Sequence, residues 1–166
     1  MALNDNIIDF AKPFITHFQN VMQTMAMITI KADKPFFKQD TVSKGDISSV
    51  IGLSGTYKKN NKIIEYKSVV SLSFPYDTYF KIANKVFGEV YTSMTPEIHD
   101  LASEFINIVT GNSKRDLEII GMTSNMAIPS TIEGKNHIIK YPPDTQVIVI
   151  PFNSELGQMF LELCLI

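Results

Sequence analysis

The sequence contains one cysteine and three histidines among its 166 residues. A single cysteine cannot form an internal disulfide, and so few thiol and imidazole groups argue against a dedicated zinc site. Cys164 lies in the apolar run 161–166, where we expect a buried small hydrophobe rather than a nucleophile. This use of cysteine favours a cytoplasmic protein.

Long apolar runs and an excess of charge of either sign are also missing. No apolar stretch approaches the ~20 residues that a membrane-spanning helix needs. The segment 1–5 lacks the basic and apolar regions of a secretory signal. The net charge is −2, and the basic residues are scattered apart from Lys58, Lys59 and Lys62. We therefore expect neither membrane insertion nor a nucleic-acid partner.

The common catalytic motifs are absent from the sequence. There is no G-x-S-x-G elbow, no G-x-x-x-x-G-K-[ST] or G-x-G-x-x-G loop, and no H-E-x-x-H pair. His17, His99 and His137 are scattered along the chain, and paired carboxylates such as Asp100 and Glu104 are common on helix surfaces. We expect this chain to bind no cofactor and no metal ion of its own.

The residues that are present predict a single domain over residues 1–166. The hydrophobic fraction of 45% and the charged fraction of 19% are ordinary for a globular protein. The length is sufficient to bury a sizeable core. Apolar periodicity gives the order helix, strands, helices, strands, with hairpin-sized connections. This order predicts an α+β fold, in which long helices pack on a largely antiparallel sheet of about six strands.

Turn residues divide the chain into its expected elements. After a lead-in over residues 1–12, Pro13 opens a helix that ends near Ala26, and Pro75 opens another that ends at Gly88. Asn60-Asn61 and Pro142-Pro143-Asp144 predict turns. Strands or extended segments are expected at residues 27–31, 47–54, 63–74, 126–132, 134–141, 146–152 and 158–166.

The stretch 95–114 has the clearest helical signals. Thr95 can cap the amino end and Pro96 suits the first turn. Gly111 can close the other end, although the helical pattern can also run on to about Ile120. At about 100° per residue, one apolar stripe results, formed by Ile98, Leu101, Ala102, Phe105, Ile108 and Val109.

The opposite face of this helix is polar. Glu104 and Asn107, three residues apart, project side by side into solvent, with Asp100 one turn earlier. Acidic residues on such a face are commonly only solvated. Asn is a mediocre helix former, so an exposed Asn107 in mid-helix invites a functional interpretation. The first helix echoes this pattern, but it has His17 where the second has Glu104.

The pattern Asp100-x-x-x-Glu104-x-x-Asn107 resembles the signature helix of the CheC/CheX/FliY phosphatases of bacterial chemotaxis. A bare E-x-x-N occurs by chance in many helices, so the ordered segments around it carry the resemblance. With His17 in place of a second Glu, the chain is similar to the single-site CheX branch. Nearly the whole chain can be laid on the CheX pattern, through the segments 50–55, 72–75, 87–88, 128–132, 134 and 147–152.

This resemblance implies a CheC-like fold and a phosphatase that hydrolyses the aspartyl phosphate of a CheY-type response regulator. The implied catalytic residues are Glu104 and Asn107. Asn107 would orient the attacking water, Glu104 would pair with a lysine of the receiver domain, and Asp100 would contact the same partner. The resemblance also implies that the phosphorylated aspartate and magnesium belong to the receiver, and that the protein is a homodimer.

Two other functions stay open at this point. The first is a non-catalytic receiver-binding or flagellar-switch adaptor on the same fold, against which the presence of both Glu104 and Asn107 favours the enzyme. The second is a small-molecule sensor domain, which no feature of the sequence favours. The sequence also leaves open whether the receiver domain belongs to a motility pathway or to another two-component circuit.

Overall fold

The structure is a computed structural model that describes residues 2–166, with side chains from Ile7 onward. Expectations for Met1 lie outside the described residues. Over residues 2–166 the chain forms helices α1 (Ala2–Met25), α2 (Tyr76–Phe87) and α3 (Pro96–Ile119). Its strands are β1 (Lys31–Ala32), β2 (Phe36–Phe37), β3 (Ile47–Lys59), β4 (Lys62–Phe74), β5 (Asn125–Met126), β6 (Ser130–Glu133), β7 (Val147–Ser154) and β8 (Gly157–Cys164).

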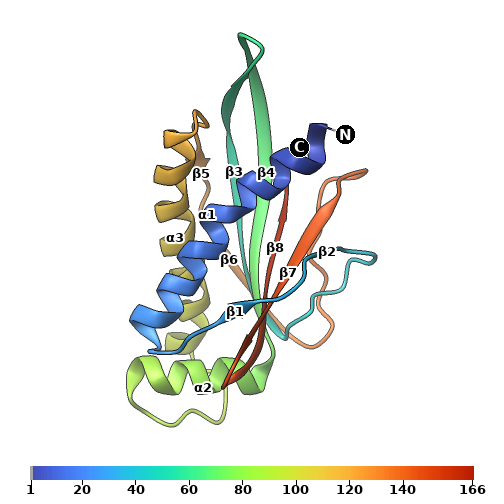
Figure 1. Cartoon of the computed structure of the whole chain (residues 1–166). Coiled ribbons are helices and arrows are strands. Elements are labelled where there is room, and N and C mark those ends of the chain that lie inside the picture. Colours follow the sequence, from blue (N-terminus) through green and yellow to red (C-terminus); the bar gives the residue numbers. More distant parts are fainter. Residues whose placement is uncertain (1) are drawn as a thin grey trace.

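All eight of these strands belong to one antiparallel sheet, so the predicted α+β class is confirmed. The order is β1-β7-β8-β4-β3-β5, with β2 also on β7 and β6 also on β3. The strand number exceeds the expected six because short strands of two to four residues line both edges. The long β3–β4 hairpin projects beyond the body of the molecule (Figure 1). It turns at Asn60 and Asn61, whose φ angles of 51° and 60° confirm the predicted turn.

The two long helices cover one face of the sheet. In Figure 1, α1 crosses the strands diagonally and α3 runs along one side of the sheet. Helix α2 lies across the lower end of the molecule. The ring of Phe18 in α1 lies 6.1 Å from that of Phe74 in β4 and 5.0 Å from that of Phe152 in β7. Phe105 of α3 reaches the same Phe74 ring at 6.0 Å. Both helices therefore share one aromatic core with the sheet.

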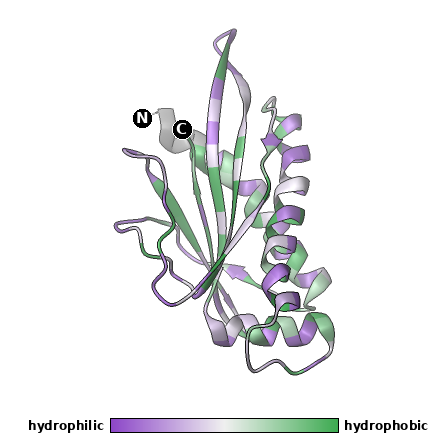
Figure 2. Cartoon of the chain, turned by 180° about the vertical axis from the view of Figure 1, so that it is seen from behind, coloured by the Kyte–Doolittle hydropathy of each residue, from purple (hydrophilic) through white to green (hydrophobic). Residues whose placement is uncertain are grey.

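The other face of the sheet carries a buried polar network. The Lys38 ammonium donates to Glu162 Oε1 at 2.7 Å, and the Tyr141 hydroxyl donates to Glu162 Oε2 at 2.7 Å. Burial and the charge of Glu162 raise the pKa of Tyr141 well above its ordinary value, so the phenol remains a donor. The segments that carry Lys38 and Tyr141 thus cover this face at Glu162. Figure 2 shows the molecule from behind, with the sheet in front of α1.

Several predicted boundaries are wrong, among them the end of the strand expected at 47–54, which continues to Lys59. The first helix begins at Ala2 rather than Pro13, because its apolar stripe continues upstream through Ile7 and Phe10. Residues 27–30 form no strand, and only Lys31–Ala32 pairs with β7. The strand expected at 134–141 is reduced to a single bridge between Ile138 and Val42.

The Lys38–Glu162 pair gives a stability prediction. Lys38→Met leaves the buried Glu162 carboxylate without its cation, so we expect a loss of about 3–5 kcal/mol in unfolding free energy. Lys12→Met is the control, because Lys12 pairs with Asp9 at the exposed surface and should lose less than about 1 kcal/mol. Urea denaturation measures both values. Equal losses of unfolding free energy in the two variants would contradict a stabilising role for the buried Lys38–Glu162 pair.

Candidate functional site

The candidate site lies on α3, whose beginning is set by local sequence. The Thr95 hydroxyl accepts a hydrogen bond from the Ile98 amide at 3.4 Å, and Pro96 is the first helical residue, as predicted. The predicted end at Gly111 is wrong, since the helix continues to Ile119, in line with the longer pattern. Burial of Leu117 on the same stripe explains the continuation.

The stripe beneath α3 is buried against the sheet largely as predicted. Ile106 is fully buried, whereas the predicted Ile108 is only half-buried. The buried face of α3 is slightly wider on one side than the apolar stripe predicted from the sequence, so it includes Ile106 and leaves Ile108 at its margin. The buried residues of α3 are Ile98, Leu101, Ala102, Phe105, Ile106, Val109, Thr110, Ser113 and Leu117.

Asp100, Glu104 and Asn107 are all exposed on the opposite face of α3. Among the described residues, neither Glu104 nor Asn107 makes a side-chain hydrogen bond or an ion pair within the chain. His99 Nδ1 lies 3.9 Å from Asp100 Oδ1. The structure therefore brings the predicted residues together on one helical face, with their polar groups directed to solvent.

Three side-chain contacts fix α3 to the rest of the molecule. Near its start, the buried Tyr79 hydroxyl of α2 donates to the Ile98 carbonyl. One residue before Glu104, the Ser103 and Thr131 hydroxyls lie 2.6 Å apart and join α3 to β6. Near its end, Asp116 contacts α1. These contacts hold the helix near both ends and on one flank. They leave free its exposed acidic face, which carries Asp100, Glu104 and Asn107.

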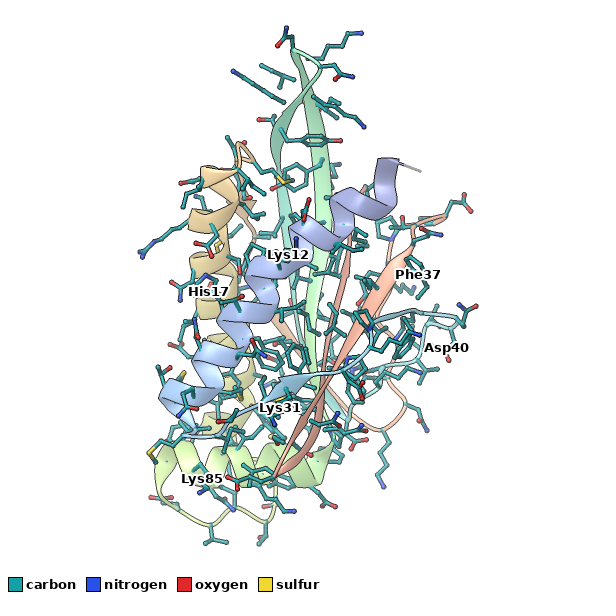
Figure 3. All side chains as sticks on the ribbon, viewed as in Figure 1. Lys12, His17, Lys31, Phe37, Asp40 and Lys85 are labelled. Atoms are coloured by element: carbon teal, nitrogen blue, oxygen red, sulfur yellow. The ribbon has the colours of Figure 1, made fainter. Side chains whose placement is uncertain are left out.

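The contact near the end of α3 involves His17. Its Nε2 lies 2.7 Å from Asp116 Oδ2, and His17 sits on the side of α1 next to α3 (Figure 3). In the sequence, His17 is marked only by its position, where a second Glu-x-x-Asn would have its Glu. Asp116 was missed, since the two residues are 99 positions apart and nothing local pairs them.

The remaining candidate groups have structural surroundings. Cys164 is buried, and burial raises the pKa of its thiol, which agrees with the predicted hydrophobe. His137 bonds to the Gly134 carbonyl at 2.8 Å and to Ser48 Oγ at 2.7 Å. Among the side chains that the structure describes, from Ile7 onward, no three His, Cys, Asp or Glu are grouped as metal ligands. No helix in this range is both long and apolar enough to span a bilayer.

Comparison with protein families matches this chain over residues 47–153 to the family described as "Chemotaxis phosphatase CheX". The matched region contains all of α3 and its exposed acidic face. The fold thus defines a CheC-like protein. The chain belongs to the CheX family. A comparison with curated proteins gave no match.

Solved structures agree with this family. A CheC-like superfamily protein from Shewanella sp. PV-4 is 36% identical, with 96% of this chain and 98% of that chain covered and a TM-score of 0.83. The chemotaxis protein CheX from Desulfovibrio desulfuricans is 30% identical, with 95% and 99% covered and a TM-score of 0.82. The CheX of a CheX–CheY–BeF3–Mg²⁺ complex from Borrelia burgdorferi shares the fold at 22% identity, with 95% and 98% covered and a TM-score of 0.76.

The two faces of α3 should respond differently to substitution. Asn107→Ala should leave the unfolding free energy unchanged or raise it by about 0.5 kcal/mol, because Asn107 is exposed and Ala is the better helix former. Phe105→Ala should lower it by about 3–5 kcal/mol through the cavity it opens. Thermal or urea unfolding measures both. A large loss in Asn107→Ala would show that Asn107 has a structural role.

Proposed function

We propose that this protein hydrolyses the aspartyl phosphate of a CheY-type receiver domain. The observation that carries the proposal is the exposed, unpaired Glu104 and Asn107 on a fixed helix in a chain of the CheX family. The CheX–CheY complex from Borrelia burgdorferi supports the choice of partner, because that protein has the same fold and is bound to CheY.

An acyl phosphate is already reactive, so its hydrolysis depends mainly on a placed water molecule and on charge compensation. In our proposal, Asn107 orients this water. Its amide has both a donor and an acceptor, so it can hold a water oxygen opposite the bond between phosphorus and the aspartate oxygen. It does this without taking up a proton. The water attacks phosphorus, and the bond to the receiver's aspartate oxygen breaks, which releases inorganic phosphate and the free carboxylate.

Glu104 has a docking role in this proposal. An ionised carboxylate accepts hydrogen bonds only, so it suits a lysine at the rim of the receiver's active site. Such a pair would fix the position of Asn107, one helical turn away. Asp100 extends the same acidic face by another turn and contacts the same partner. The receiver supplies the phosphorylated aspartate and magnesium.

The alternative is a non-catalytic adaptor that binds the receiver on the same surface, in a flagellar switch or another circuit. The proposed reaction places the protein in the bacterial cytoplasm with its receiver. The two functions differ in one measurable respect, since an adaptor binds the phosphorylated receiver without accelerating loss of its phosphate.

Phosphate release from a phosphorylated CheY-type receiver tests the enzyme. Asn107→Ala should lower kcat by at least about tenfold with little change in KM, because the water loses its orientation. Glu104→Ala should raise KM by a similar factor, because docking weakens. Glu118→Ala, exposed near the end of the same helix, is the control and should change neither. Full activity in Asn107→Ala would refute the catalytic assignment.

We also propose a homodimer, formed through the β1–β2 edge of the sheet. Phe36 and Phe37 of β2 are exposed there, and both β1 and β2 are short strands that pair with β7. Exposed apolar edges favour pairing with a second chain, and symmetric dimers are the commonest result. The opposite edge of the sheet, at β5 and β6, lies beside α3.

Sedimentation equilibrium at micromolar concentration tests the dimer. The wild-type protein should sediment as a dimer, and Phe37→Asp should shift it to the monomer, because a charge replaces an apolar contact at the interface. Ile63→Asp, exposed near the tip of the β3–β4 hairpin, should leave the dimer intact. A monomeric wild-type protein would contradict the proposal.

A further inference from the structure

The sheet edge beside α3 contains an irregularity. β5 and β6 both lie along β3, but their registers differ by one residue, since Met126 pairs with Leu53 whereas Ser130 pairs with Val50. Between these pairs, three residues of the outer segment stand against two of β3. One extra residue in an antiparallel pair is a β-bulge. Bulges are frequent at sheet edges and next to active sites, where they redirect a side chain.

A backbone hydrogen bond locates the extra residue. The Ala127 amide donates to the Gly52 carbonyl at 3.0 Å, so Ala127 stays in register with β5. Ile128 and Pro129 are therefore the two residues that oppose the single residue Ile51. The regular pairs on both sides and the proline ring restrain the backbone at Ile128.

Ile128 lies on the helix-covered side of the sheet. Met126 packs against the core, and the Thr131 hydroxyl meets Ser103 of α3, so both side chains face that side. Successive side chains alternate between the faces, which places Ile128 on the same side as Met126. Ile128 is nevertheless 90% exposed. It therefore projects from the sheet edge, beside α3 rather than beneath it.

The direction of α3 relative to β3 is set by two contacts. Ser103 of α3 meets Thr131, which pairs with Ser49. Beyond the end of α3, Met122 forms a bridge with Tyr57. Because both chains advance from the first contact to the second, α3 and β3 run in the same direction.

This direction places Ile128 level with the candidate site. Ile51, which opposes Ile128, is two residues beyond Ser49, or about 6–7 Å along the strand. The same rise along α3 takes about four to five residues at ~1.5 Å each. Counted from Ser103, this interval ends at Asn107.

We propose that Ile128 contacts the phosphorylated receiver domain and determines its affinity, next to Glu104 and Asn107. The inference rests on the proposed function and extends the docking surface from α3 onto the β5–β6 bulge. A restrained apolar side chain loses little conformational freedom on binding, so its burial translates efficiently into affinity. Its high exposure means that the fold gains little from it.

Receiver kinetics and binding test the contact. Ile128→Ser should raise KM for the phosphorylated receiver about tenfold, change kcat less than twofold, and leave the melting temperature unchanged. Ile128→Val should retain affinity near that of the wild type. Ile63→Ser is the matched control, because Ile63 is also apolar and 70% exposed but lies near the hairpin tip. It should change neither constant.

The outcomes separate this inference from the proposed function. An unchanged KM in Ile128→Ser, or an equal rise in Ile63→Ser, would overturn the contact while leaving the phosphatase intact. If the wild-type protein does not accelerate phosphate release from the receiver, the proposed function fails. The contact is then tested separately, by measuring the affinity of the same variants for the receiver in a titration. Tenfold weaker binding by Ile128→Ser then supports it, and equal binding overturns it.

Discussion

The burial of one face of α3 against the sheet is the constraint on which the rest of the site depends. Phe105 packs on Phe74, the residue that Phe18 of α1 also contacts, so α3 cannot rotate without opening the shared core. Once this face is fixed, helical geometry leaves Glu104 and Asn107 together on the outside. Core packing thus determines which polar groups the protein presents to a partner.

Polar contacts add precision to this arrangement. Apolar packing tolerates small sliding movements, whereas the Ser103–Thr131 and His17–Asp116 contacts require particular distances and directions. Both contacts lie outside the exposed acidic face, so they restrain α3 without occupying it. A helix that is restrained before binding loses less freedom when a partner docks, which favours both affinity and accurate placement of Asn107.

Much of the fold was predictable because its signals are local. The Thr95 cap, the stripe of α3 and the Asn60-Asn61 turn each depend on a few neighbouring residues, and the structure confirms them. The errors arose where distant contacts decide. Residues 134–141 gain their order from the His137–Ser48 and Tyr141–Glu162 bonds rather than from strand pairing. Similarly, no local pattern indicates the His17–Asp116 contact, since the two residues lie far apart in sequence. Pro129 locally predicts a break in the extended segment 126–132, and the structure has that break between β5 and β6. The register shift at Ile128 depends on pairing with the distant β3 and was not predictable from the segment itself.

Single-turnover decay of a phosphorylated CheY-type receiver, followed with this protein in saturating excess, tests the central claim most directly because saturation removes the contribution of binding. We predict that the wild-type protein accelerates the decay to a plateau rate. With Asn107→Ala, the receiver should still be bound, but its decay should return close to the spontaneous rate. Decay at the wild-type plateau rate in the presence of bound Asn107→Ala would contradict the account.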